Sequence, residues 1–348
     1  MSLLSITSPH MNKSNVRSVG WVMTQVILAT VPAILAMTWY FGWGTLINIS
    51  LAVIVALLSE AFALKLRKRP MSFYLKDGSA IVTALLLALA LPTFAPWWLT
   101  TVGVAFAIIV AKHMYGGMGY NPFNPAMVAY ALLLVSFPVD MTQWSFPNHS
   151  FVLSFSDTFS HIFGLSVAHD GLTSATPLDA MKHSAGQTLN ELFASKAALQ
   201  PETFEAYQVV SVAFLLGGIY LLARKIYTWH APIGMLAGIA VIATIFQIID
   251  PDSYAPASFH LLTGATMLGA FFIVTDPVTS ATSTKGRLIF GIGVGILVYL
   301  IRTFGNYPDA VAFAVLLMNF ASPFLDQYTQ PRTYGHRKAR SGLPKKKD

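Results

Sequence analysis

The sequence predicts an all-α membrane protein that crosses the bilayer about ten times, as two five-helix repeats of opposite orientation. Three observations lead to this prediction: the composition, a series of apolar runs, and a similarity between the two halves. The chain has 348 residues, of which 55% are hydrophobic and only 11% are charged. A soluble domain of this size carries roughly a quarter charged residues. The few charges here cannot cover a water-facing surface, so a soluble enzyme is excluded.

Several kinds of site are also excluded. The chain contains no cysteine, which rules out disulfides, thiolate metal sites and cysteine-ligated iron–sulfur clusters within it. It contains neither a Gly-x-x-x-x-Gly-Lys-Ser/Thr phosphate loop nor a His-Glu-x-x-His zinc motif. Its nine histidines are scattered. We therefore expect neither a metal nor a nucleic acid as a ligand.

Ten apolar runs are candidates for membrane spans. A helix needs about 20 mostly apolar residues to cross the hydrocarbon, and fewer where it is broken or shielded by neighbours. The third, fourth, fifth and ninth runs are short, which indicates tilted or interrupted helices packed inside the protein. In chain order, the runs are 21–40, 44–64, 79–91, 98–111, 125–138, 207–223, 232–249, 259–274, 288–301 and 310–325.

The basic residues predict the orientation, because Lys and Arg are enriched in cytoplasmic connections. With the N-terminus in the cytoplasm, all but three of the 22 basic residues fall on the cytoplasmic side. The exceptions are Lys182, Lys196 and Arg302. Both termini are therefore expected in the cytoplasm. The predicted divisions are a first repeat over 1–138, an external loop over 139–206, a second repeat over 207–326 and a basic tail over 327–348.

The two halves resemble each other. The segment Pro-Ala-Met-Val-Ala-Tyr-Ala at 125–131 aligns with Pro-Asp-Ala-Val-Ala-Phe-Ala at 308–314. Because each half holds five predicted spans, an odd number, the second half must enter the membrane in the opposite direction. Inverted repeats of this kind form sites at their shared midplane, often from broken helices. The arrangement is similar to that of urea transporters.

The external loop carries a motif of small residues. The loop holds seven acidic residues against two lysines, and its aromatic side chains favour a folded segment. Long loops in compact proteins are usually functional or disordered. The motif Asp-Gly-Leu-Thr-Ser-Ala-Thr-Pro-Leu at 170–178 begins with a turn signal. Its small residues would leave a threonine hydroxyl open to a modifying enzyme, although the pattern alone is that of an ordinary turn.

Other segments have structural explanations. Gly291, Gly293 and Gly295 lie within one span, where small residues let helices approach closely. Asp276 follows a span and precedes a proline, so it is a candidate either for helix capping or for ion binding. Three charged residues near span ends are predicted to anchor the helices at the membrane interface, namely Glu60, Asp250 and Arg302.

Over nearly its whole length the sequence resembles the RnfD/NqrB family. Members of this family are membrane components of the Rnf ion-translocating electron-transport complex and of the sodium-pumping NADH:quinone reductase. The loop motif at 170–178 is one of the segments that carry the resemblance. The others are Ser8-Pro9-His10, Lys76-Asp77-Gly78-Ser79-Ala80, Asn121-Pro122-Phe123-Asn124-Pro125-Ala126 and Thr275-Asp276-Pro277-Val278-Thr279.

The resemblance implies a covalent flavin. In the family, the last threonine of a Ser/Thr-Gly/Ser-Ala-Thr motif carries FMN through a phosphodiester, and this role falls on Thr176. The motif residues Asp170, Gly171 and Ser174 accompany it, with Ser174 standing where many relatives have glycine. Thr282 ends a second Thr-Ser-Ala-Thr copy at 279–282, but its predicted cytoplasmic position disfavours it, because the family's flavin transferase resembles a periplasmic enzyme.

A second flavin is also implied. In the related sodium pump, a matching asparagine segment is linked to bound riboflavin, which makes Asn121 and Asn124 candidates for that ligand. The alternative is that both asparagines cap backbone groups at a Gly/Pro helix break.

The resemblance therefore implies one membrane component of a multisubunit, redox-driven ion pump in the bacterial inner membrane. Electrons would pass between ferredoxin and NAD through partner subunits, coupled to movement of Na⁺ or H⁺. The other expected partners are the lipid bilayer and a periplasmic flavin transferase. Two alternatives are a passive channel or solute transporter with the same architecture, and a structural anchor for the complex. A channel has no need of a flavin attachment motif.

Overall fold

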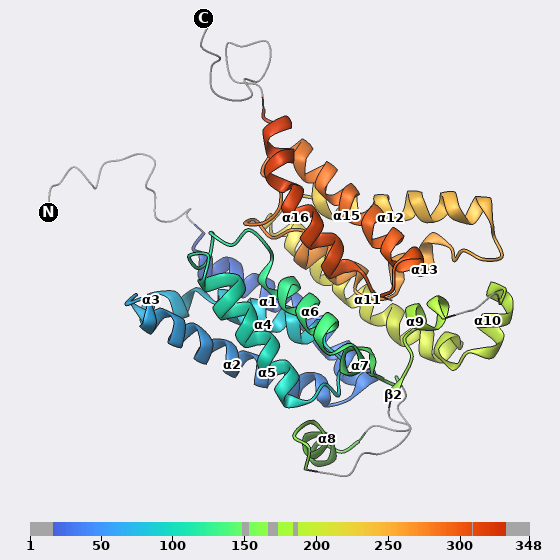
Figure 1. Cartoon of the computed structure of the whole chain (residues 1–348), viewed down its shortest axis with the longest axis horizontal. Helices are drawn as coiled ribbons and strands as arrows, with labels where there is room; N and C mark the ends of the chain where they lie inside the picture. The colour runs from blue at the N-terminus through green and yellow to red at the C-terminus, as the bar shows by residue number, and fades with distance from the viewer. Residues whose placement is uncertain (1–16, 148–152, 166–172, 184–186, 308, 332–348) are drawn as a thin grey trace, which may run out of the picture.

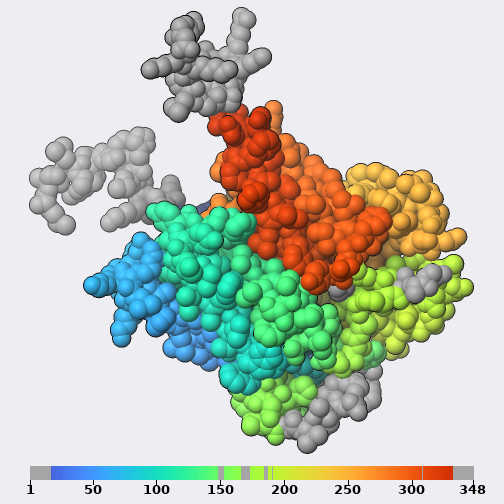
Figure 2. Space-filling view, viewed as in Figure 1, coloured from blue at the N-terminus to red at the C-terminus, as the bar shows by residue number. Residues whose placement is uncertain are grey.

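The computed structural model describes residues 17–147, 153–165, 173–183, 187–307 and 309–331. Within these ranges the chain is almost entirely helical (Figure 1). The two halves of the chain lie side by side, and the connecting segment packs at one end of the molecule (Figures 1 and 2).

The first half is a series of helices, and its third segment is divided into short pieces. Ser18 begins the first half as an N-cap whose side chain accepts a hydrogen bond from the backbone of Trp21. The elements are α1 (Val19–Phe41), α2 (Gly44–Leu66), α3 (Met71–Tyr74), η2 (Leu75–Asp77), α4 (Ser79–Ala90), α5 (Trp97–Phe106), the π-helix η3 (Ala107–His113) and α6 (Pro125–Ser136).

The second half repeats this order of long and broken helices. Its break falls in the third segment, where two short helices and a π-helix replace one continuous helix. The elements are α11 (Pro201–Ala223), α12 (His230–Ile249), α13 (Ala257–Leu262), α14 (Thr266–Leu268), the π-helix η6 (Gly269–Ile273), α15 (Thr284–Phe304) and α16 (Val311–Tyr328).

The connecting segment contains short elements, so its described parts are folded, as its aromatic content predicts. The strands β1 and β2 pair antiparallel, with Trp144 opposite Ser174. We call the end of the molecule that carries this segment the loop end. Its elements are α7 (Pro138–Thr142), β1 (Trp144–Ser145), α8 (Phe155–Ile162), β2 (Thr173–Ser174), α9 (Pro177–Lys182), α10 (Leu189–Ser195) and η5 (Ala197–Leu199).

Five of the described helices are long and apolar enough to cross a membrane, namely α1, α2, α11, α12 and α15. The bent pair Met71–Asp77 and Ser79–Ala90, whose axes differ by 43°, is either a sixth, broken span or a re-entrant loop. The continuous helix Trp97–His113 and α6 are shorter apolar helices. A polytopic helical membrane protein is thereby confirmed, while the described helices of full spanning length are five or six rather than ten.

Three predicted segments differ from the observed helices. The eighth run, 259–274, is not one helix, because Gly264 adopts a φ of 62° and separates α13 from α14. The ninth run is short in the prediction, but α15 has 21 residues. The polar residues Lys285 and Arg287 hide its first turns from a reading based on hydrophobicity. The sixth predicted run, 207–223, corresponds to α11, which begins earlier, at Pro201, inside the predicted loop. The prediction misses this start because the first turn of the helix is polar.

Glycines set the closest helix contacts in the second half. A Cβ on Gly291 would lie 2.3 Å from the carbonyl oxygen of Ala231, and one on Gly295 would lie 2.2 Å from that of Met235. The backbones of α12 and α15 therefore touch along this face. This confirms the predicted role of the glycine run, because only a residue without a side chain permits such an approach.

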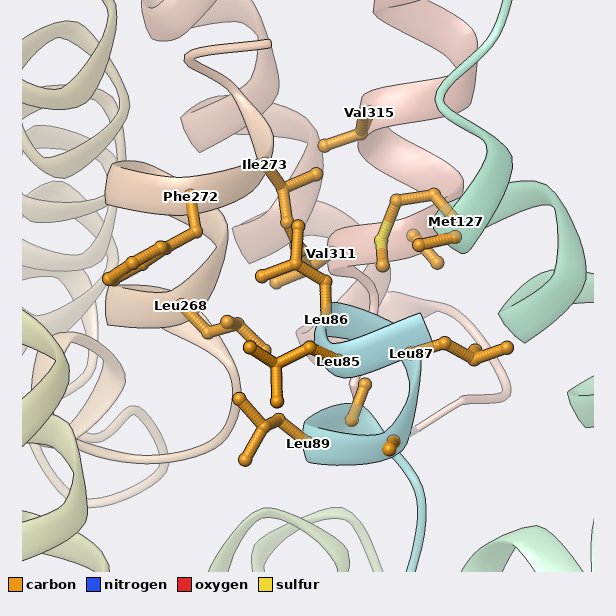
Figure 3. Close-up of a cluster of buried hydrophobic side chains, with 14 of the residues drawn as sticks. Leu85, Leu86, Leu87, Leu89, Met127, Leu268, Phe272, Ile273, Val311 and Val315 are labelled. Carbon is orange, nitrogen blue, oxygen red and sulfur yellow. The ribbon is translucent and has the colours of Figure 1, made fainter. Parts of the chain in front are cut away.

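The broken segments of both halves meet in a shared apolar core. Figure 3 shows side chains from α4, α6, α14, η6 and α16 gathered at this meeting point. All are buried, so the core joins the two halves. The labelled side chains are Leu85, Leu86, Leu87 and Leu89 from α4, Met127 from α6, Leu268 from α14, Phe272 and Ile273 from η6, and Val311 and Val315 from α16.

Candidate functional site

Thr176 is the N-cap residue of α9. Its backbone is extended, with φ −73° and ψ 160°, and its Oγ1 accepts a hydrogen bond from the backbone N–H of Asp179 at 3.2 Å. Pro177 occupies the first helical position, where the N–H that proline lacks would have no partner in the helix. Because Oγ1 is the acceptor in this bond, the hydroxyl hydrogen of Thr176 is not used by the cap.

The two-stranded sheet fixes the chain before Thr176. Ser174 lies half-buried in β2, and Ala175 follows it as an exposed residue. The hydroxyl of Ser145 in β1 hydrogen-bonds that of Thr93, which ties the sheet to the break after α4. The predicted motif residues Asp170 and Gly171 lie outside the described residues. The described part of the motif thus presents a threonine at a junction between a strand and a helix.

Two hollows meet at this junction. An inner cavity of about 110 Å³ lies between the two halves and is bordered by Thr176. An outer recess of about 500 Å³ is bordered by residues 173–175 together with Gln143, His183 and Tyr307. The hydroxyl of Thr176 therefore stands where a group attached to it can reach either an apolar interior or a polar surface recess.

The inner cavity is mainly apolar, with a few polar groups. Tyr130 and Tyr207 line it, and the Tyr207 hydroxyl is buried without a hydrogen-bond partner among the described residues. A buried hydroxyl without a partner is costly unless a ligand or water satisfies it. Residues from both halves form the apolar wall, including Met37, Phe41, Leu89, Met127, Phe214, Leu268 and Val311.

A buried ion pair closes one side of this cavity. The Arg302 Nη2 lies 3.1 Å from the Asp309 Oδ1, and the Arg302 Nη1 donates to the carbonyl oxygen of His260 at 2.9 Å. Asp309 also accepts from the backbone N–H of Ala265 at 2.8 Å. Arg302 is only 5% exposed, so its prediction as an interfacial anchor is wrong. Its partner, Asp309, lies in the turn before α16.

Asn121 and Asn124 border a second hollow, of about 470 Å³, far from the loop end. Asn124 caps α6, since its Oδ1 accepts from the backbone of Ala126 at 3.1 Å and of Met127 at 3.2 Å. The Asn121 Nδ2 donates to the carbonyl oxygen of Phe123 at 3.0 Å. The capping alternative is therefore confirmed for Asn124, and both side chains still line a hollow large enough for a ligand.

Asp276 joins the two halves beside this hollow. Its Oδ2 accepts from the Asn124 Nδ2 at 3.3 Å and from the Thr279 Oγ1 at 3.0 Å. Its Oδ1 accepts from the backbone N–H of Val278 at 3.1 Å. Asp276 does not cap a helix, because the next helix, α15, begins at Thr284 with Ser283 as its N-cap; its carboxylate instead satisfies the turn that follows it.

One buried charge cluster escaped sequence analysis. The Lys112 Nζ donates to the Glu60 Oε2 at 2.8 Å and to the Ser79 Oγ at 2.8 Å, and the His113 Nε2 lies 3.2 Å from the Glu60 Oε1. Glu60 is 1% exposed, so its prediction as an interfacial anchor is also wrong. The only signal was a charge inside an apolar run, which is rare and usually paired. Lys112 and Ser79 border the same hollow as Asn124.

The second Thr-Ser-Ala-Thr copy has a different environment. The Thr282 Oγ1 donates to the Asp326 Oδ1 at 3.0 Å, and its backbone N–H donates to the same oxygen at 2.8 Å. The hydroxyl hydrogen of Thr282 is thus engaged, unlike that of Thr176. The two threonines lie near opposite ends of α15, because Thr282 precedes Thr284 while α9 contacts Ile301 and Arg302.

The chain is similar to known proteins along almost all of its length. Residues 5–335 match the family described as NQR2, RnfD, RnfE. A relative from Ectopseudomonas mendocina, named as one of the subunits of the ion-translocating oxidoreductase complex, is 56% identical over 99% of both chains. A protein of the same name from Alcanivorax borkumensis is 54% identical over 98% of this chain and 99% of its own. One from Cellvibrio japonicus is 53% identical over 98% and 97%.

Proposed function

The chain belongs to the NQR2, RnfD, RnfE family, and from this we propose that it is the membrane subunit of an ion-translocating oxidoreductase complex and carries FMN on Thr176. It supplies one step of an electron path and is not a complete enzyme. Other subunits of the complex deliver and collect the electrons, between ferredoxin and NAD, and the electron transfer is coupled to movement of Na⁺ or H⁺.

The observation that carries this proposal is the position of the Thr176 hydroxyl. It stands at a fixed strand–helix junction, half-buried, with its hydrogen free of the cap and with a hollow on either side. A phosphodiester at Oγ1 needs this access for the flavin transferase.

The residues around Thr176 fit a flavin. When bound, FMN carries one or two electrons, while the protein sets its position and electronic environment. The apolar wall of the inner cavity suits a hydrocarbon ring edge, and Tyr207 offers an unpartnered hydroxyl. Gln143 and Tyr307 offer polar groups in the outer recess. The covalent bond keeps the flavin at this place, because no dissociation equilibrium remains.

We also propose a non-covalent riboflavin in the second hollow. The hollow of about 470 Å³ is bordered by the amides of Asn121 and Asn124, by Asp276 and by the Lys112 ammonium group. Donors and acceptors that border one hollow suit a flavin, whose ring edge and ribityl chain require both. A flavin here would lie far from Thr176 along the helix axes, so the two flavins would serve opposite ends of the molecule.

The proposed topology has ten membrane segments as two inverted repeats, over 1–138 and 207–326. The packing of α1 against α11 and of α6 against α16 supports it, because matching elements of two repeats meet at a two-fold axis. The loop at 139–206 would face the periplasm, and both termini with the tail at 327–348 would face the cytoplasm of a bacterial inner membrane. Side chains of the apolar core in Figure 3 line both hollows, Leu268 and Val311 the inner cavity and Leu86 and Phe272 the second hollow.

The test of the attachment site uses denaturing gel electrophoresis under ultraviolet light. The complex is expressed in a host that contains the flavin transferase, and the band of this chain should fluoresce. Thr176→Ala should abolish the fluorescence, since the ester oxygen is gone. Thr282→Ala is the matched control and should leave it unchanged. A fluorescent band in the Thr176→Ala variant would show that the flavin is attached elsewhere, and a dark wild-type band would overturn the flavin proposal.

A further inference from the structure

The short helix α9 is attached to the membrane-spanning bundle at its far end from Thr176. Lys182, in its last turn, directs its ammonium group at two backbone carbonyls in the last turn of α15 and at one in the connection that follows it. The Nζ donates to the oxygen of Tyr307 at 2.7 Å, of Arg302 at 3.1 Å and of Ile301 at 3.3 Å. The last carbonyls of a helix lack partners within it and attract a positive charge. Lys182 therefore acts as a cap on α15 from a different element.

Burial accompanies these contacts. Desolvation lowers the pKa of Lys182, and the nearby Asp179 carboxylate opposes that shift. A lysine on an exposed loop would keep its full hydration. Lys182 itself is half-buried.

The end of α15 is itself a fixed point. Arg302 is bonded to Asp309 and to the carbonyl oxygen of His260, which joins α15 to α13 and to the turn before α16. A group that binds the carbonyls of Ile301 and Arg302 is thus fastened to the core of the second half rather than to a surface loop.

A second contact holds α9 on the side that faces Gly264. Leu178 is 6% exposed and packs against Gly264, where an added Cβ would lie 2.4 Å from the Leu178 Cδ1. Gly264 has a φ of 62°, so both its conformation and the lack of a side chain make room for Leu178. Leu178 and Lys182 lie one turn apart on the same face of α9, and together they fix the helix whose N-cap is Thr176.

We infer that Lys182 is a positioning residue that holds α9, and with it a flavin on Thr176, in one orientation over the inner cavity. This rests on the proposed function. Leu178 and Ala180 pack α9 into an apolar cluster on one side, and apolar contacts are not directional, whereas the hydrogen bonds of Lys182 fix the direction of its last turn. A covalent bond fixes only one end of the cofactor, so the orientation of its ring depends on how firmly the attached helix is held.

The test compares Lys182→Gln with Lys182→Arg in the intact complex. Covalent attachment is measured by the mass of the peptide that contains Thr176. Orientation is measured by the fluorescence anisotropy of the attached flavin and by its quenching with iodide, after subtraction of the signal from Thr176→Ala. Lys182→Gln should keep the flavin but show lower anisotropy and stronger quenching. Lys182→Arg should restore both, because a guanidinium can donate to the same carbonyls.

Lys196→Gln is the matched control, because it removes the same charge from the same connecting segment. It should leave anisotropy and quenching at wild-type values. Leu178→Ala loosens the other attachment and should change both readouts in the same direction as Lys182→Gln. This variant tests the inference by a second route where Lys182→Gln assembles poorly.

The outcomes separate this inference from the proposed function. A wild-type peptide without the flavin mass would overturn the proposed function. A wild-type peptide with the flavin, and unchanged anisotropy and quenching in Lys182→Gln, would overturn the role of Lys182 alone. Loss of attachment in both the Gln and Arg variants, with Lys196→Gln normal, would also overturn it, because the lysine would then serve the transferase and not the position of the helix.

Discussion

At the scale of single residues, the cluster of Glu60, Lys112 and His113 makes a strong prediction. Removing one partner of a buried ion pair costs about 3–5 kcal/mol, because the other charge stays buried without compensation. Glu60→Gln leaves the Lys112 ammonium group, 3% exposed, without its carboxylate. We expect a marked fall in the thermal unfolding midpoint of the purified complex. The double variant Glu60→Gln with Lys112→Met should recover part of the loss.

Glu205→Gln provides the control for this experiment, since Glu205 is exposed and the change is chemically the same. It should unfold like the wild type. Unfolding of Glu60→Gln at the wild-type temperature would mean that Lys112 does not depend on Glu60 for its charge. Sequence analysis missed this cluster because its two main members are separated by 52 residues along the chain, and a hydrophobicity pattern contains no information on which helices pack together.

At the scale of elements, the contact between α12 and α15 can be tested with two glycines of the same helix. In Gly295→Ala the new methyl group would lie 2.2 Å from the carbonyl oxygen of Met235, which is backbone and cannot turn aside. Overpacking of this kind costs roughly 1–3 kcal/mol. In Gly293→Ala the nearest atom is the Cε of Met318 at 2.6 Å, the flexible end of a side chain.

We therefore expect Gly295→Ala to lower the thermal unfolding midpoint and Gly293→Ala to change it little. Equal midpoints for the two variants would contradict the close backbone contact. The role of these glycines was predictable, because their spacing within an apolar run has one common structural meaning. The breaks in the helices were less predictable. The turn at Gly264 lies between the apolar segments 261–262 and 267–274, so the run 259–274 reads as continuous although left-handed backbone divides it.

In the site, too, local features are predictable from the sequence, whereas contacts between distant parts of the chain are not. Thr176 is singled out by the family resemblance, while the local pattern alone is that of an ordinary turn; its helix cap was missed although a threonine before a proline is a helix-start signal. The cavity beside it could not be predicted, since Tyr130, Tyr207 and Asp309 come from three separate parts of the chain. The rule that basic residues lie on the cytoplasmic side treats Lys182 only as an exception. Its hydrogen bonds to backbone carbonyls explain the presence of a basic residue at this position.

At the scale of the whole molecule, the proposed orientation can be measured because the chain has no cysteine. A single cysteine can therefore be labelled without removing others. Ser156→Cys, on α8 at the loop end, should react in intact cells with a maleimide that cannot cross the inner membrane. Lys76→Cys, in the connection before α4, should react only after the membrane is opened. Ser156 and Lys76 are both exposed in the structure.

Labelling of Lys76→Cys but not Ser156→Cys in intact cells would reverse the proposed orientation and place Thr176 in the cytoplasm. Labelling of neither, before or after opening, would mean that partner subunits cover these surfaces, and exposed positions on α10 and in the connection after α2 would then decide the orientation.

The glycine contact between α12 and α15 has a consequence for how such a molecule could change shape. Two helices whose backbones touch along several turns cannot slide past each other without steric conflict, so this pair must travel as one rigid body. Any rearrangement that opens one side of the molecule and closes the other must then be absorbed by its neighbours. Arg302 also ties this pair to α13 and to the turn before α16, so those segments belong to the same rigid body.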